Sequence, residues 1–183
     1  VDWLIILASS NDVVNYTINS SPTANFENVR ASYGDDTLVG DNNANRLVGW
    51  GGADTIRGGA GDDYIYGYVD ENPQGVSDEA DNLYGEAGDD TLVGGAGDDV
   101  LDGGTGRDVL SGEGGSTSDF DASYYNGGSN GSDTFVTRAG DGGPQIELAD
   151  VITDFEDGTD RIGLEGISFT DLTITQGSDD YAN

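Results

Sequence analysis

One nine-residue pattern, repeated in register, limits what this 183-residue chain can fold into. Three consecutive copies between Gly85 and Ser111 read GEAGDDTLV, GGAGDDVLD and GGTGRDVLS. Each copy has glycine first and fourth, aspartate sixth and leucine eighth. Glycine is costly inside a helix but suits a tight turn, and the residues after the aspartate favour a strand. The pattern therefore predicts an all-β chain in which a turn and a short strand alternate.

Side chains alternate along a strand, so each repeat should direct one large apolar residue inward. We expect successive turns to lie on opposite sides of a flattened coil, so that two repeats make one circuit of eighteen residues. Aspartates eighteen residues apart, such as Asp81 and Asp99 or Asp90 and Asp108, should then stack on one side. The residues predicted to point inward are Leu38, Leu47, Ile56, Ile65, Leu83, Leu92, Leu101, Leu110 and Phe135.

Stacked aspartates beside glycine-turn carbonyls would form a cage of hard oxygen ligands. Such a cage suits Ca²⁺, which accepts six to eight oxygens in a flexible geometry, better than Mg²⁺, which requires a strict octahedron. Asn45 is a neutral amide, so a site that uses it should be weaker. The predicted side-chain ligands of several Ca²⁺ ions are Asp36, Asn45, Asp54, Asp63, Asp81, Asp90, Asp99, Asp108, Asp133, Asp154 and Asp160. The predicted carbonyl ligands are those of Gly34, Gly52, Gly59, Gly61, Gly88, Gly95, Gly97, Gly104, Gly106 and Gly131.

The net charge of the chain limits the classes of partner that it can bind. There are 36 acidic residues and only 6 basic ones, all of them arginine, which gives a formal net charge of −30. Such a chain should repel nucleic acid and anionic membranes and, without cations, itself. With 34% apolar residues and 31 glycines, composition alone would suggest a disordered linker, whereas the periodicity indicates order that depends on metal. No stretch is long enough to insert in a membrane, and the absence of cysteine rules out disulfides.

The repeats divide the chain into three parts. Residues 1–30 are predicted to form an N-terminal cap that includes a strand from Val13 to Ile18. Residues 31–136 form the repeat region, with excursions at 67–75 and 112–127. The first excursion is either a degenerate rung or a surface loop of repeat length. Residues 137–183 are predicted to form a C-terminal cap region that is truncated, so the chain is interpreted as a fragment of a longer protein.

The end of the repeat region carries a more specific resemblance. A last copy ending Asp133-Thr-Phe-Val136 is followed by I-x-D-F-x-x-G-x-D-x-I-x-L at residues 152–164. Over residues 31–166 the chain resembles the RTX (repeats-in-toxin) domains of serralysin-type proteases and the calcium-binding modules of alginate epimerases. The resemblance implies a parallel β-roll, two short-stranded sheets back to back with calcium along both rows of turns. It also implies an extracellular protein that folds on calcium after type I secretion.

Catalytic interpretations of the sequence are weaker. Residues 127–131 match the nucleophile motif G-x-S-x-G, but the chain has no histidine and the match lies in a glycine-rich loop. Zinc catalysis lacks its usual ligands, and stacked carboxylates at this spacing are metal ligands before they are glycosidase acids. Residues 154–165 loosely resemble an EF-hand loop, but the glycine is one position early, and a terminal cap is the better account. We predict no catalytic residues.

An aromatic patch and the role of the parent protein remain open. Tyr66 and Tyr84 are predicted to stack one circuit apart, with Tyr64 close by, where they would contact a glycan or a partner or simply pair across strands. The sequence favours a calcium-dependent structural module of a secreted protein, surface-bound, adhesive or matrix-forming, in which self-association is open. The alternative is the secretion and folding domain of an exoenzyme, a protease, lipase or epimerase, whose catalytic domain lies outside this chain.

Overall fold

The computed structural model describes residues 3–5, 13–18, 27–68, 79–113, 131–141, 149–156 and 158–167. These residues form fourteen short strands and contain no helix, and therefore no helix that could span a membrane. The strands are β1 (Trp3–Ile5), β2 (Asn15–Thr17), β3 (Asn28–Arg30), β4 (Thr37–Val39), β5 (Arg46–Trp50), β6 (Thr55–Ala60), β7 (Tyr64–Tyr68), β8 (Asn82–Ala87), β9 (Thr91–Val93), β10 (Val100–Thr105), β11 (Val109–Ser111), β12 (Thr134–Arg138), β13 (Val151–Ile152) and β14 (Arg161–Glu165).

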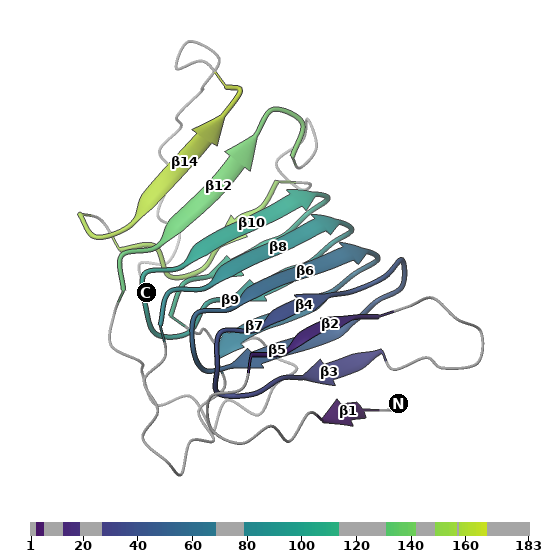
Figure 1. Cartoon of the computed structure of the whole chain (residues 1–183). Helices are drawn as coiled ribbons and strands as arrows, with labels where there is room; N and C mark the ends of the chain where they lie inside the picture. The colour runs from purple at the N-terminus through teal and green to yellow at the C-terminus, as the bar shows by residue number, and fades with distance from the viewer. Residues whose placement is uncertain are drawn as a thin grey trace, which may run out of the picture.

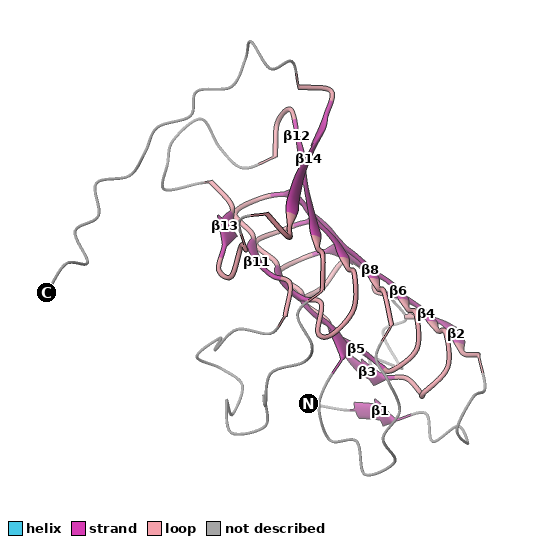
Figure 2. Ribbon diagram, turned by 90° about the vertical axis from the view of Figure 1, so that its left-hand side faces the viewer, coloured by secondary structure: helices cyan, strands magenta, loops and turns pink. Residues whose placement is uncertain are grey.

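Successive strands belong alternately to two seven-stranded parallel sheets. One sheet has the order β1-β3-β5-β7-β9-β11-β13 and the other β14-β12-β10-β8-β6-β4-β2. The chain climbs as a flattened spiral from β1 at the bottom to β14 at the top of Figure 1, and the two sheets form separate layers when the molecule is turned (Figure 2). This is a parallel β-roll, which confirms the predicted all-β fold.

Strand register confirms the circuit of eighteen residues and decides the nature of the first excursion. Thr37 pairs with Thr55, and Arg46 pairs with Tyr64. Across the excursion, however, Ile56 of β6 pairs directly with Leu83 of β8. The aspartates of these two rungs are 27 residues apart, nine more than one circuit. Both sheets therefore pair directly across the extra residues, so these residues add no rung to the roll. The excursion starts later than predicted, because β7 continues to Tyr68.

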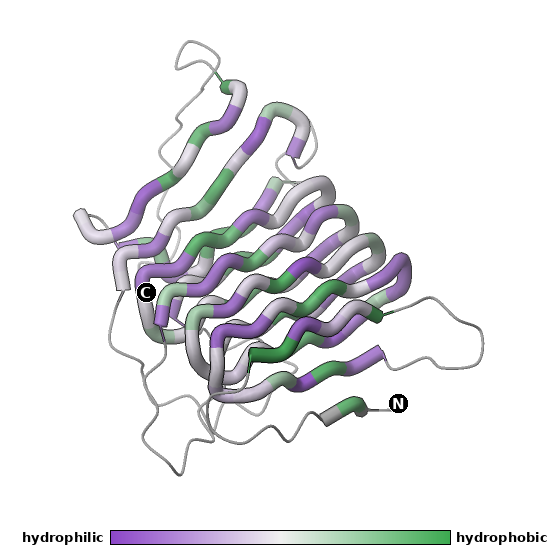
Figure 3. The backbone as a smooth tube through the Cα atoms, viewed as in Figure 1, coloured by the Kyte–Doolittle hydropathy of each residue, from purple (hydrophilic) through white to green (hydrophobic). Residues whose placement is uncertain are grey.

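A single column of apolar side chains fills the space between the sheets. Each strand from β3 to β12 contributes the residue at the eighth repeat position, and along the strands hydrophobic and hydrophilic residues alternate (Figure 3). All nine residues predicted to point inward are at most 2% exposed: Leu38, Leu47, Ile56, Ile65, Leu83, Leu92, Leu101, Leu110 and Phe135. The column explains how a chain with so few apolar residues has a core.

Both ends of the roll are extra rungs. The predicted strand around Tyr16 is β2, which pairs with β4, and Val29 of β3 is fully buried in the core column. The N-terminal segment therefore continues both sheets. At the other end β13 pairs with β11 and β14 pairs with β12, so the tail folds back as predicted. Its burial is less complete than expected, because no described rung stacks on this last one; Val151, Phe155 and Ile162 stay exposed.

The predicted stack of Tyr66 on Tyr84 is wrong. Tyr66 lies in β7 of one sheet, whereas Tyr84 lies in β8 of the other. The nine extra residues between them shift the chain by half a circuit, so residues eighteen apart fall on opposite sides. Tyr66 is buried against Val48 and Val93, whereas Tyr84 lies under the guanidinium of Arg57. The tyrosines therefore do not form one exposed patch.

Candidate metal centre

The sixth-position residues form two rows, one in the turns on each side of the roll. Within a row, each side chain after the first accepts through Oδ1 the backbone N–H of the sixth residue one rung earlier. Asp99, for example, accepts the N–H of Asp81, and Asp108 accepts that of Asp90, both at 2.8 Å. One row contains Asp36, Asp54, Asp81, Asp99, Asp133 and Asp160, and the other Asn45, Asp63, Asp90, Asp108 and Asp150. The predicted stacking of aspartates is confirmed.

The second carboxylate oxygen of many of these residues has no partner. Oδ2 is inaccessible to solvent and accepts no hydrogen bond in Asp63, Asp90, Asp99, Asp108 and Asp133, all at most 1% exposed. A buried polar atom without a partner costs free energy, and a buried negative charge costs more. A row of such atoms indicates that the fold is complete only with a ligand that supplies positive charge.

Burial changes the ionisation of these carboxyl groups. Loss of hydration raises the pKa of Asp63, Asp90, Asp99 and Asp108 to about 7, and repulsion from neighbouring carboxylates adds to the rise. The backbone N–H bonds to Oδ1 oppose it only in part. The same cause raises the pKa of Asp133 to about 6. At neutral pH these aspartates are therefore only partly ionised, and a bound cation would favour their ionised form.

First-position glycines surround each unpartnered oxygen, a role that the sequence analysis missed. A Cβ on Gly94 would lie 2.1 Å from Oδ2 of Asp99 and 2.6 Å from the carbonyl oxygen of Gly112. Gly85 stands in the same relation to Asp90 and to the carbonyl of Gly103. The carboxylate of one rung and a carbonyl of the next therefore converge on one small space that any side chain would fill. The glycine that begins each of the three consecutive copies between Gly85 and Ser111 is the signal that could have found it.

Most of the glycines predicted as carbonyl ligands lie in the turns, where consecutive rungs nearly touch, and Gly59 and Gly104 lie near the ends of β6 and β10. A Cβ on Gly106, whose φ is +143°, would lie 1.9 Å from the carbonyl oxygen of Gly88. The second-position glycines show the same approach: a Cβ on Gly104 would lie 2.3 Å from the carbonyl oxygen of Glu86. Carbonyl oxygens of one turn therefore lie directly against the glycines of the next. The set comprises Gly34, Gly52, Gly59, Gly61, Gly88, Gly95, Gly97, Gly104, Gly106 and Gly131.

Some predicted ligands already have hydrogen-bond partners. Both carboxylate oxygens of Asp36 accept hydrogen bonds, Oδ1 from the N–H of Val14 and Oδ2 from Ser32. Asn45 accepts the N–H of Asp41 at 2.8 Å. Asp154 accepts hydrogen bonds from Ser111, Gly112 and Glu113. Asp36 and Asn45 begin the two rows, and Asp154 lies outside them. Because hydrogen bonds already occupy these residues, their geometry does not by itself require an ion.

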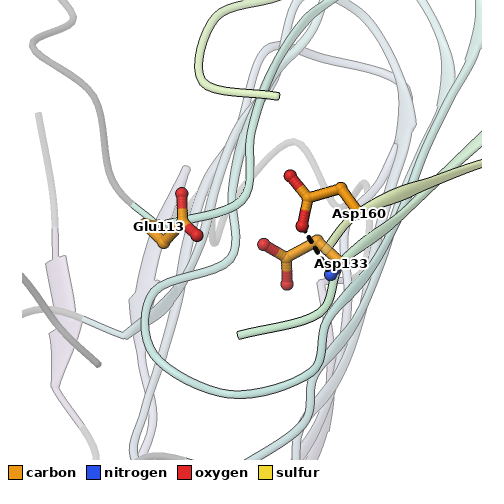
Figure 4. A group of neighbouring side chains, drawn as sticks. All are labelled: Glu113, Asp133 and Asp160. Carbon is orange, nitrogen blue, oxygen red and sulfur yellow. Dashed lines mark hydrogen bonds between the residues drawn. The ribbon is translucent and has the colours of Figure 1, made fainter. Parts of the chain in front are cut away.

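The C-terminal end of the roll brings a further acidic group together. Carboxylate oxygens of Glu113, Asp133 and Asp160 lie within 4.8 Å of one another (Figure 4). Burial, with the charges of Asp154, Asp133 and Asp160, raises the pKa of Glu113 to about 7. Sequence reasoning predicted Asp133 and Asp160 but not Glu113, which occupies a second position where the motif has glycine. Residues 127–130 of the G-x-S-x-G match lie outside the described part.

Comparison with known families agrees with this geometry. The family model of the RTX calcium-binding nonapeptide repeat, in four copies, matches residues 30–65 and 77–117. These are RTX repeats. The interruption of the match coincides with the first excursion, and the matched segments contain β4 to β6, the start of β7 and β8 to β11. A search of curated proteins gave no match. RTX repeats bind Ca²⁺ and occur in secreted bacterial proteins, so this part of the chain is a calcium-binding structural module and indicates an extracellular protein.

Proposed function

We propose that the chain is a module that folds and stiffens when it meets extracellular calcium. The observation that carries the proposal is the row of buried, unpartnered Oδ2 atoms at the sixth position. The Oδ2 atoms of Asp63, Asp90 and Asp99 each lie beside a carbonyl of the next rung, and Ca²⁺ is the common ion whose coordination is flexible enough for such mixed oxygen cages.

The ligands fall into regular sets. In each turn, a Ca²⁺ ion would take Oδ2 of the sixth-position aspartate together with turn carbonyls of the same and the next rung. Asp63, Asp90, Asp99, Asp108 and Asp133 are the strongest candidates, because their Oδ2 atoms lack partners. Asp54 and Asp81 occupy the same row positions. Asp36, Asn45 and Asp154 would contribute less, because hydrogen bonds already occupy them.

Folding and calcium binding are then one process. The rows form only when the turns stack, so the unfolded chain has no site, and the stacked turns without cations hold many buried carboxylates close together. Binding free energy therefore becomes folding free energy. A secreted protein with this module stays unfolded where calcium is scarce and folds outside the cell, where calcium is abundant.

The parent protein is proposed to be a non-enzymatic surface, adhesive or matrix-forming protein, since the described residues include no recognisable catalytic set. The alternative is a domain of an RTX exoenzyme. Two features support a structural role for the module itself. Both sheets are continuous ladders of paired strands. The chain is also strongly acidic, and arginine is its only type of basic residue. In this proposal the chain binds neither nucleic acid nor membrane lipid.

Two measurements test the proposal. Circular dichroism should show a coil in excess chelator at pH 7.5 and a β-spectrum on addition of millimolar Ca²⁺, whereas Mg²⁺ at the same concentration should not produce it. A native β-spectrum in chelator would refute calcium-dependent folding. Sedimentation velocity in calcium separates the two parents: a matrix-forming module should assemble with concentration, and the folding domain of an enzyme should stay monomeric.

A further inference from the structure

Glu113 and Glu86 occupy the same repeat position but lie in different surroundings. Each follows the first-position glycine of a turn. Glu86 is exposed and forms an ion pair with Arg57 of the neighbouring strand, at 3.2 Å. The Oε1 atom of Glu113, in contrast, is inaccessible to solvent and accepts no hydrogen bond. The side chain of Glu113 therefore lies toward the roll and not on its outer face.

The neighbours of Glu113 are also acidic. Its carboxylate faces that of Asp133, with Asp160 beside them (Figure 4). Asp133 is fully buried, and its Oδ2 has no partner. One oxygen from each of the three residues lies within 4.8 Å of the other two. Two ligands on opposite sides of a Ca²⁺ ion are about 4.6–5.2 Å apart, so the three oxygens are close enough together to be ligands of one ion.

Hydrogen bonds hold the three carboxylates in place. Asp154 accepts the backbone N–H of Gly112 at 2.9 Å and of Glu113 at 3.0 Å, which fixes the turn that carries Glu113. Asp160 accepts the N–H of Asp133 at 3.1 Å and that of Glu156 at 2.8 Å. These bonds orient the carboxylates but bring no positive side chain to them, so the charge of the cluster stays uncompensated.

We propose that Glu113, Asp133 and Asp160 bind one Ca²⁺ ion that clamps the C-terminal end of the roll. The nonapeptide motif does not specify this site, because the motif has glycine at its second position. The site rests on the proposed function only in that the turns take up calcium. With three carboxylates, where a regular turn offers one or two, it binds its ion more tightly than the rows do.

The position of the clamp gives it a structural role. Glu113 follows β11, Asp133 precedes β12 and Asp160 precedes β14, so one ion joins three turns. It also holds together the two ends of the long stretch of sequence between Glu113 and Gly131, which lacks the motif. Closing a loop of this length costs conformational entropy that the nine-residue repeats avoid. The ion offsets this cost and keeps β12 and β14 in register with β10.

The experiment compares full-length Glu113→Gln with full-length Glu86→Gln, a matched control at the same repeat position. Equilibrium dialysis and calorimetry with Ca²⁺ should show that Glu113→Gln loses one ion of the tightest class or binds it at least tenfold more weakly. Hydrogen exchange at limiting Ca²⁺ should become faster in β12 and β14 and stay unchanged in β6 and β8. Glu86→Gln should match the wild type in both measurements.

The outcomes separate this site from the rest of the proposal. Identical calcium binding and exchange in the two variants would overturn the clamp while leaving the rows intact, whereas a wild-type chain that takes up no Ca²⁺ would overturn the proposed function itself. If Glu113→Gln does not fold at any calcium concentration, Glu113→Asp decides. This variant keeps the charge with a shorter reach, so weakened uptake of one ion supports the clamp, and unchanged uptake overturns it.

Discussion

Replacing Asp99 by asparagine should have opposite effects on the metal-free and the calcium-bound roll. Asparagine can keep the Oδ1 that accepts the N–H of Asp81, and its amide would stand where Oδ2 now lies next to the carbonyl of Gly112. Asn45 shows that an amide fits a row position. The shape of the turn is therefore retained, and only the charge is lost.

The gain for the metal-free roll follows from the ionisation of Asp99. Burial raises the pKa of this carboxyl group from 3.8 to about 7. Above pH 7.5 its ionised form costs the fold roughly 4 kcal/mol, since each pKa unit is about 1.4 kcal/mol. Burying the amide costs about 1–2 kcal/mol of this gain. We expect the metal-free variant to be more stable than the wild type by about 2–3 kcal/mol.

The loss for the calcium-bound roll comes from the missing ligand charge. A neutral amide in place of a carboxylate should weaken its site at least tenfold, or by about 1.4 kcal/mol. The control is Asp35→Asn, at the exposed fifth position next to the row. Asp35 accepts the N–H of Ala53 at 3.1 Å, a bond that asparagine preserves. This change should leave both quantities close to those of the wild type.

Circular dichroism measures both effects. A titration of metal-free protein with a stabilising osmolyte should show folding of Asp99→Asn at a lower osmolyte concentration than the wild type needs. A calcium titration should show its midpoint at a higher concentration. If Asp99→Asn and Asp35→Asn have the same calcium midpoint, Asp99 is not a ligand; if the metal-free variant folds less readily than the wild type, Asp99 is not an uncompensated charge.

Two further predictions concern protons and the C-terminal rungs. Because the folded pKa of Asp63, Asp90, Asp99 and Asp108 is about 7 against about 3.8 unfolded, the folded state binds more protons between these values, so metal-free stability is greatest below pH 4 and is lost as pH rises through 7. Metal-stripped protein should therefore show a β-spectrum at pH 5 that disappears by pH 8, and a coil at both would contradict this. A chain ending at Val136 should need more calcium than one ending at Gly166, because it lacks β13 and β14; equal midpoints in a calcium titration would show that these rungs do not stabilise the roll.

The sequence was sufficient for every feature set by the period. Leu38, Ile56 and Leu101 could be placed in the core because each stands two residues after the turn aspartate, and alternation along a strand allows only one such side chain to point inward. The aspartate rows follow from the same count, since two turns return the chain to the same side. A short exact repeat thus determines topology, core and candidate ligands together.

What the sequence could not give depends on breaks in the period and on side-chain direction. Tyr66 and Tyr84 were misplaced because the nine extra residues equal one repeat in length. The sequence period therefore continues without a visible break, although β8 lies in the other sheet from β7. Glu113 and Glu86 have the same position in the motif, yet only the fold shows that one lies inward and the other pairs with Arg57. The hydrogen-bond donors to Asp36 are Val14, one rung earlier, and Ser32, at a position where the motif has glycine.

The acidity of the chain and the stability of the roll have one origin. The carboxylates that make the metal-free rows unfavourable, such as Asp90 and Asp108, are buried because their Oδ1 atoms hold consecutive rungs together. Their burial leaves Oδ2 without hydration, which favours either a proton or a Ca²⁺ ion. Replacing the rows with neutral residues would therefore stabilise the fold without metal and remove its response to calcium. The response requires a structure that is unstable on its own.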